Sequence, residues 1–354
     1  MELIEYRFDE VTINFDKKRV PLSGAQREKR QGEYRYYGAQ GVIDHIDDFI
    51  FDGTYLLIAE DGENLKSKKQ NIAQVVEGQF WVNNHAHIVQ GNELCNTRYL
   101  CYLLNSMDLS GYITGSAQPK LSQANLNAVI LLLPPIHVQD KIVEYLYMLD
   151  RKITINQQIN DNLQQQAQAI YASMFVDNAE PTWKQGHLSD FVIVRYGKDH
   201  KKLADGIYPV YGSGGIMRYV ERPLYDKESV LIPRKGTLNN VMYVNQPFWS
   251  VDTMFYTEMR LPNVAKFVYH FVKAKDLASM NAGSAVPSMT TDILNAMEVV
   301  IPPASALEEF ETLVAPMYRA MQENDAQSKK LADLRDALLP KLMSGEIDVS
   351  GIQL

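Results

Sequence analysis

Short apolar segments alternate with turn residues over about the first 130 residues of the chain, and again after residue 180. Aliphatic runs such as Tyr55–Ala59 and Val230–Pro233 predict strands. Gly, Asn, Asp and Pro residues interrupt these runs about every eight to twelve residues, which is typical of turns. The mixed segments Arg98–Asn105 and Ala265–Lys275 predict short helices. The pattern therefore predicts two α+β globular parts with much irregular structure.

A helical stretch follows each globular part and starts after a double proline, Pro134-Pro135 or Pro302-Pro303. Its apolar residues recur at alternating steps of four and three, which is a heptad seam, and both seams turn polar at the same place. Each stretch spans about 40 residues, or roughly 60 Å. A core helix of a bundle is the simpler interpretation, but length and the matched polar gap favour an antiparallel coiled-coil pair. The predicted seam residues are Ile142, Leu146, Leu149, Ile153, Asn156, Asn160, Leu163 and Ile170, with Phe310, Val314, Met317, Met321, Asn324, Leu331 and Leu338 in the second stretch.

The chain is an internal duplicate. Tyr37–Gly62 aligns with Tyr211–Gly236 without a gap at an offset of 174 residues, and Gly115–Pro135 aligns with Gly283–Pro303 at 168. Phe80-Trp81 matches Phe248-Trp249 at the second offset, so the second copy has a shorter loop between these matches. We expect two similar domains separated by the helix pair, with pseudo-two-fold symmetry. The expected boundaries are residues 1–135 and 179–303 for the domains and 136–178 and 304–354 for the helical spacers.

Composition places the chain among folded proteins without a membrane span. Of its 354 residues, 46% are hydrophobic and 22% are charged, which excludes a disordered chain. The apolar run Ala128–Leu133 is far shorter than the ~20 residues of a membrane span. The acidic start MELIEYRFDE has no signal-peptide pattern, and the two cysteines, Cys95 and Cys101, read as small core residues and not as a disulfide framework. We expect a cytoplasmic protein.

The net charge of −8 argues against non-specific coating of nucleic acid, but it is unevenly distributed. The two helical stretches carry −7 of it, while the first globular part is at −4 and the second at +3. Within the globular parts, basic residues cluster beside Gly, Asn and aromatic residues. Lys and Arg neutralise phosphates, and Arg and Asn read base edges. A solvated loop is the alternative for each cluster. The candidate DNA-binding residues are Lys17, Lys18, Arg19, Arg27, Lys29, Arg30, Tyr36, Lys66, Lys68, Lys69, Asn83, Asn84 and Lys120 in the first copy, and Arg195, Lys198, Lys201, Lys202, Arg218, Arg234, Lys235, Thr237, Asn239 and Asn240 in the second.

Catalytic signatures are missing from the sequence. It has no phosphate-binding loop, dinucleotide fingerprint, nucleophile elbow, zinc motif or amino-methyltransferase motif. His85 and His87 would share one strand face, but no third metal ligand is nearby, so a polar strand face is expected there. Asp44, Asp47 and Asp48 are interpreted as a solvated face because basic residues replace two of them in the second copy. We expect no catalytic site, metal or cofactor in this chain.

The sequence resembles the DNA-specificity subunit of type I restriction–modification systems over nearly its whole length. The features that carry the resemblance are the Tyr-Gly-x-x-Gly stretches leading to Leu57-Ile58 and Leu231-Ile232, the Gly-Ser-Ala loops Gly115–Ala117 and Gly283–Ala285, the Leu133-Pro134-Pro135 junction, the helical series from Gln139 to Asp177, Trp183, and the tail Leu339–Ile347. Pro303–Leu307 departs from the family, which usually has a Glu-Gln pair after the prolines.

The resemblance implies two target-recognition domains that each read one half of a bipartite double-stranded DNA target. It implies helices that set the spacing and dock two modification (methyltransferase) subunits, which would carry S-adenosylmethionine. Restriction subunits, if present, would bring ATP and Mg²⁺. Two alternatives stay open: a coiled-coil scaffold that binds only protein, and a self-sufficient enzyme.

Overall fold

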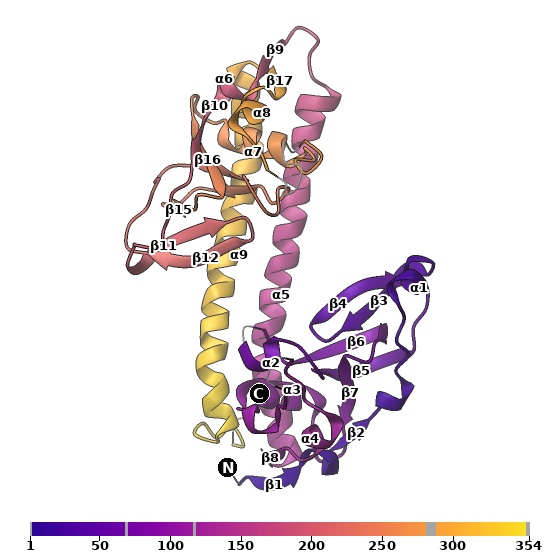
Figure 1. Ribbon diagram of the computed structural model, residues 1–354. Coiled ribbons are helices and arrows are strands. Elements are labelled where there is room, and N and C mark those ends of the chain that lie inside the picture. The colour runs from indigo at the N-terminus through magenta and orange to yellow at the C-terminus, as the bar shows by residue number, and fades with distance from the viewer. Residues whose placement is uncertain (1, 68–69, 116–117, 281–287, 352–354) are drawn as a thin grey trace. The chain divides into compact units, whose positions relative to one another are not determined.

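The computed structural model describes residues 2–67, 70–115, 118–280 and 288–351 (Figure 1). The chain divides into two compact units, one of Met1–Ile155 with Gln327–Leu354 and one of Asn156–Ala326. Two long helices, α5 (Ile136–Ala172) and α9 (Ala304–Met343), each continue from one unit into the other. Both begin directly after the double prolines, as predicted, because proline fits just before a helix but cannot continue a strand ladder.

The first unit holds a six-stranded sheet with the strand order β2-β7-β5-β6-β3-β4. The small pair of β1 with β8 lies outside that sheet. The strands are β1 (Ile4–Arg7), β2 (Thr12–Asn14), β3 (Gln31–Gly38), β4 (Gly41–Ile46), β5 (Phe51–Ala59), β6 (Ala73–Val82), β7 (Ala86–Gly91) and β8 (Ile130–Leu133), and the short helices are α1 (Gly24–Glu28), α2 (Asn64–Ser67), α3 (Thr97–Ser106) and α4 (Gln123–Asn127).

The second unit repeats this order in two sheets, β10-β16-β13-β14 and β12-β11-β15, with a separate pair of β17 and β9. Its elements are β9 (Lys184–His187), α6 (Leu188–Phe191), β10 (Val192–Tyr196), β11 (Asp205–Gly212), β12 (Gly215–Val220), β13 (Ser229–Pro233), β14 (Met242–Val244), β15 (Trp249–Ser250), β16 (Met254–Met259), α7 (Ala265–Lys273), α8 (Thr291–Asn295) and β17 (Glu298–Ile301).

The sheets of the two copies differ in one strand, and helices α1 and α2 of the first unit have no counterpart among the described helices of the second. Continuous β6 corresponds to the separate strands β14 and β15, and Pro247 stands in the segment between those two. Proline has no N–H to donate to a ladder, so it interrupts the strand there. The parallel pairing survives the break, because Tyr36 pairs with Trp81 in the first unit and Val210 pairs with Trp249 in the second. The duplication seen in the sequence is therefore also a structural duplication.

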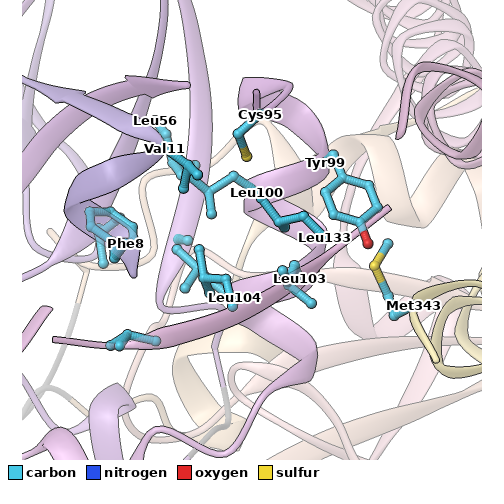
Figure 2. Close-up of a cluster of buried hydrophobic side chains, with 14 of the residues drawn as sticks. Phe8, Val11, Leu56, Cys95, Tyr99, Leu100, Leu103, Leu104, Leu133 and Met343 are labelled. Carbon is cyan, nitrogen blue, oxygen red and sulfur yellow. The ribbon is translucent and has the colours of Figure 1, made fainter. Parts of the chain in front are cut away.

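The core of the first unit joins the domain to both long helices. Tyr99, Leu100 and Leu104 on α3 are fully buried, and Leu342 and Met343 at the end of α9 belong to the same cluster. Figure 2 shows Met343 beside the ring of Tyr99. The second unit has the corresponding core, rich in aromatic rings: Tyr171, Phe175, Phe267 and Phe310 contact one another at centroid distances of 4.9–6.2 Å.

The long helices pair antiparallel within each unit. In the second unit, Asn160 contacts Met321 and Asp325, while Tyr171, further along α5, contacts Phe310, earlier on α9. In the first unit, Asp150 on α5 pairs with Arg335 on α9. The α+β class and the coiled-coil pair are those expected from the sequence.

The polar gap of the seam is a hydrogen-bonded cluster inside the second unit. Asn160 Nδ2 donates to Asp325 Oδ1 at 2.8 Å, and Asn324 Nδ2 donates to Asn160 Oδ1 at 2.8 Å. Asn156 is fully buried, and its Nδ2 donates to the Asn324 carbonyl. Burial raises the pKa of the Asp325 carboxyl, although the bond from Asn160 lowers it. Such a cluster fixes the register of a helix pair, because a shifted register would leave its polar groups unpaired.

None of the helices in the described part of the chain is long and apolar enough to cross a membrane.

Candidate nucleic-acid interface

Arg19 is held inside the first unit. Its guanidinium pairs with Glu60 at 3.0 Å and with Asp16 at 3.3 Å, and it donates to the Ala86 carbonyl at 2.8 Å. The side chain is only 15% exposed. Burial would raise the pKa of Glu60, but the hydrogen bond from Arg19 and the neighbouring cations outweigh it and lower that pKa. In this arrangement Arg19 braces the fold and is not available to a phosphate.

Arg27 and Arg30 are largely neutralised by carboxylates of the adjacent strand and turn. Arg27 Nε bonds Asp44 Oδ2 at 2.8 Å, and Arg30 Nε bonds Asp47 Oδ1 at 2.8 Å. Arg30 also reaches Asp48 at 3.4 Å. The three aspartates are therefore ion-pair partners, where the sequence suggested only a solvated face. The sequence could not reveal these pairs, because the β3–β4 register brings together groups 17 or 18 residues apart.

Two residues chosen for DNA contact are core residues in this structure. Tyr36 is fully buried, and its hydroxyl accepts from the Leu22 N–H at 2.8 Å. Asn83 is 7% exposed, and its Oδ1 accepts from the His85 N–H at 2.8 Å in a local turn. Tyr36 lies within strand β3 and Asn83 lies in the turn between β6 and β7, and both side chains are buried. Neither side chain can reach a base from its present position.

Several candidates in the second unit also have internal partners. Arg195 pairs with Glu258 at 3.1 Å, and Arg218 pairs with Asp205 at 2.6 Å. Asn239 bonds Asp276, and Asn240 Nδ2 donates to the Ser213 carbonyl. Both asparagines belong to the loop that follows β13, and these two hydrogen bonds tie that loop to the rest of the unit. Arg234 lies over the ring of Tyr196 at 5.3 Å and leaves that ring half exposed.

The remaining candidates lie at the surface or outside the residues that the structure describes. Lys66 donates to the Gly115 carbonyl, and Lys120 pairs with Glu60 at 3.2 Å while staying half exposed. Lys68 and Lys69 lie outside the described residues. The exposed candidates for which the described chain shows no ion pair are Lys17, Lys18, Lys29, Lys198, Lys201, Lys202 and Lys235, and the exposed uncharged ones are Asn84 and Thr237.

The two histidines around Ala86 do not form a polar strand face. His87 is 1% exposed, with Nδ1 2.6 Å from Asp16 Oδ2 and Nε2 2.8 Å from the Leu121 carbonyl. His85 precedes β7 and contacts Asp61 instead. Burial raises the pKa of Asp16, but hydrogen bonds from His87 and the Ile88 N–H outweigh this, so the pKa is lowered. Among the described residues, no group of His, Cys, Asp and Glu could hold a metal ion.

The cysteines lack the character of nucleophiles. Cys95 is buried, and burial raises the pKa of its thiol to about 12. Cys101 lines a cleft of about 480 Å³ between α3, β6 and the long helices of the first unit, and burial likewise raises its pKa to about 12. A thiol with so high a pKa carries almost no thiolate near neutral pH, so this cleft offers no reactive sulfur.

Sequence reasoning missed the polar groups that join each domain to its helices. In the second unit, His270 on α7 is fully buried, with Nε2 2.9 Å from the Tyr318 hydroxyl and Nδ1 2.8 Å from Gln168 Oε1. Burial lowers the pKa of His270 to about 4, which keeps the ring neutral. The corresponding residues of the first unit are Tyr102 and Asp150, whose side chains bond at 2.5 Å. The 168-residue offset could have identified these pairs as equivalent.

The family model for the type I restriction modification DNA specificity domain matches residues 5–165 and again residues 180–314. A Haemophilus influenzae protein named as a type I restriction enzyme specificity subunit is 26% identical over 358 residues, covering 91% of each chain. The specificity subunit of the type I restriction enzyme MjaIX from Methanocaldococcus jannaschii is 24% identical, covering 72% of this chain and 69% of that one.

The fold has a counterpart among solved structures. The type I restriction–modification S subunit from M. genitalium superposes with a TM-score of 0.64 at 16% identity, covering 97% of this chain and 96% of that one. At this identity the likeness is one of fold. The family match covers both copies of the duplicated domain, and together these matches span most of the chain. The chain belongs to the type I restriction–modification DNA specificity family.

Proposed function

We propose that this chain is the DNA-recognition subunit of a type I restriction–modification complex, and that it is not itself the catalytic subunit. The observation that carries the proposal is the separate match of the specificity-domain model to each copy of the duplicated unit. Two reading domains on one chain suit a DNA target in two halves. Residues 1–135 and 179–303 would form the target-recognition domains, and residues 136–178 and 304–354 the helical spacers.

The exposed lysines without internal ion pairs are the candidates for phosphate contact. Lys201 and Lys202 lie next to Leu203, whose carbonyl accepts from Arg218 on β12. Lys17 and Lys29 occupy exposed positions in the first domain. Because each neutralised phosphate releases counterions, binding would weaken steeply with salt. Arg19, Tyr36 and Asn83 are left out of the proposed contacts, since internal hydrogen bonds engage them.

The long helices would set the spacing of the two half-sites and dock two methyltransferase subunits. Outward apolar side chains support the docking: Met148, Ile155 and Ile159 on α5 are 37–50% exposed, and Leu313 and Leu334 on α9 are 46–48% exposed. Exposed apolar side chains on both helices suit a surface that a protein partner covers. S-adenosylmethionine would be bound by the methyltransferase subunits, and ATP and Mg²⁺ by restriction subunits. A cytoplasmic location suits a DNA partner and the two free cysteines.

The test uses the complex of this chain with its methyltransferase subunits. Its affinity is measured for the cognate duplex and for an arbitrary duplex of equal length over a series of salt concentrations. We expect preference for the cognate duplex by at least about a thousandfold. Equal affinity for both duplexes would refute the proposal.

A protein-only scaffold is the competing function, and one pair of residues separates the two. Arg234 and Lys235 lie in the loop after β13, next to exposed Thr237. If the domains read DNA, Arg234→Ala with Lys235→Ala weakens binding and lowers its salt dependence. If the chain is a scaffold, the same change leaves complex function intact. Lys273→Ala, at the exposed end of α7, serves as the matched control.

A further inference from the structure

Each unit contains the same β-hairpin with the same irregularity. Strands β3 and β4 turn between Gly38 and Gly41, and strands β11 and β12 turn between Gly212 and Gly215. In the first hairpin Tyr36 pairs with Asp44 and Tyr37 pairs with Val42, so Ile43 is an extra residue. The second hairpin skips Met217 in the same way. A bulge of this kind redirects a side chain and is common near functional sites.

The bulge presents apolar side chains to solvent in both units. Val42 and Ile43 are 44% and 52% exposed, and Ile216 and Met217 are 49% and 61% exposed. The residue-by-residue burial of β4 and β12 is identical. Both strands lie at the edge of their sheet, where charged residues normally prevent association. Two adjacent exposed apolar residues, kept at the same place in both copies, indicate a surface with a partner.

Each bulged side chain, although half exposed, lies against a glycine of the opposite strand. A Cβ atom at Gly212 would lie 2.5 Å from Met217 Sδ, and one at Gly38 would lie 3.2 Å from Ile43 Cγ2. Each bulged side chain therefore lies close over the glycine of the opposite strand, and a larger residue there would make that side chain shift. This gives the tip of the hairpin a defined shape.

A polar side chain from outside the hairpin bonds each hairpin turn. Gln40 Nε2 donates to Asn64 Oδ1 at 3.3 Å in the first unit. In the second, Asn240 Nδ2 donates to the Ser213 carbonyl at 2.8 Å. Helix α2, which contains Asn64, also carries Lys66, and the loop that contains Asn240 also carries exposed Lys235. Cationic side chains thus lie on the segments that bond the hairpin turns.

This combination fits the major groove of DNA. The groove is about 12 Å wide and admits a two-stranded β-ribbon, and apolar side chains in it contact the thymine methyl group. Lysines beside the ribbon would meet the phosphates. The side chains differ between the copies, Val-Ile against Ile-Met, while the backbone is the same. That is expected if one scaffold reads two different half-sites.

We propose that the two hairpin tips enter the major groove, one in each half-site, and that Ile43 and Met217 contact base edges there. The inference rests on the proposed DNA-recognition function, since it assigns the reading element of each domain. It commits to DNA as the occupant of these surfaces, and a protein partner is an outcome of the test.

The test measures binding of the methyltransferase complex to the cognate duplex and to all its single-base-pair variants. We expect Met217→Ala to lower cognate affinity about tenfold and to remove discrimination at one or two adjacent positions of one half-site. Ile43→Ala should do the same in the other half-site. Ile13→Ala on β2 and Leu261→Ala after β16 truncate side chains of similar exposure, 49% and 45%, and should change neither. Thermal unfolding confirms that each variant folds.

The outcomes separate this inference from the proposed function. If the wild-type complex discriminates and both hairpin variants keep that discrimination at every position, the hairpin assignment is wrong and DNA recognition stands. A variant that no longer binds the methyltransferase subunits would make the tip a protein-docking surface and also overturn the assignment. If the wild-type complex does not discriminate, the proposed function itself fails.

Discussion

At the scale of single residues, the structure separates cations by what else they contact. Arg19 and Lys17 are two residues apart, and sequence alone gives them the same role. Arg19 is enclosed by Asp16, Glu60 and the Ala86 carbonyl, whereas Lys17 is exposed. The difference depends on Glu60 and Ala86, which only the folded sheet brings close. Charge clusters in a sequence therefore overstate the number of cations available to DNA.

Arg19→Ala should destabilise the first unit, because it removes a largely buried cation that pairs with both Glu60 and Asp16. We expect the free energy of unfolding to fall by about 3 kcal/mol, since removing one member of an enclosed ion-pair cluster leaves its carboxylates less well compensated. Lys17→Ala should change it by less than about 0.5 kcal/mol. Urea unfolding of both variants provides the measurement, and equal stability of the two would contradict the structural role of Arg19.

His270 should make the stability of the second unit depend on pH. Its pKa falls from 6.5 to about 4 in the folded state, so the unfolded chain binds the extra proton first. The stability supported by the neutral ring is complete above pH 6.5 and is lost as pH falls towards 4. The loss amounts to at most about 3 kcal/mol.

The check compares thermal unfolding of the wild type and of His270→Gln between pH 7 and pH 4.5. The variant should lose less stability on acidification, because glutamine does not titrate. Tyr318→Phe, which removes the hydroxyl near Nε2 and keeps the histidine, should retain the wild-type pH dependence in direction. Parallel pH profiles for the wild type and His270→Gln would show that the buried ring is not the cause.

At the scale of elements, the sequence was most informative where the pattern is local. The double prolines and the heptad steps predicted where α5 and α9 begin and how they pair. The aliphatic runs around Leu57 and Leu231 likewise predicted the strands β5 and β13. The sequence could not predict contacts that depend on sheet register. Tyr36 is buried within its hairpin, and Asp44 meets Arg27 only because β3 pairs with β4. The bulges at Ile43 and Met217 were also invisible, since a bulge has no local sequence pattern here.

The polar gap of the helix pair should behave as a coupled unit. Asn160→Leu leaves Asn324 Nδ2 and Asp325 without their partner, so we expect a loss of about 1–2 kcal/mol. Adding Asn324→Leu replaces one broken bond with an apolar contact, and should recover about 1 kcal/mol relative to the sum of the single changes. Chemical unfolding of the three variants gives the coupling. Simple additivity would mean that the observed hydrogen bond contributes nothing.

At the scale of the whole molecule, one folded unit is used twice on a pair of continuous helices. The net charge of −8 is concentrated in the helical stretches, which suits protein partners, while the exposed lysines proposed for phosphate contact lie in the domains. The first domain has a net charge of −4, which disfavours DNA. There, Asp44, Asp47 and Asp48 form ion pairs with Arg27 and Arg30. A duplicated reader with distinct side chains on a common backbone explains how one chain could address two half-sites.

If the helices set the spacing, lengthening both should move the half-sites apart. A seven-residue insertion in α5, matched by one in α9 to preserve the seam, adds about 10 Å at 1.5 Å per residue. At 3.4 Å per base pair, the target spacer should grow by about three base pairs. Sequencing of methylated sites made by the variant complex measures the spacer. An active complex with an unchanged spacer would show that the helices do not determine it.

The central claim, recognition of a bipartite DNA target by this chain, is tested most directly by mapping N6-methyladenine across the host genome with and without the gene. The account predicts one split motif, two short specific halves around a fixed spacer, that is methylated in the parent strain and unmethylated after deletion. Complementation with the intact gene should restore it. A deletion strain whose methylated motifs are unchanged would contradict the account.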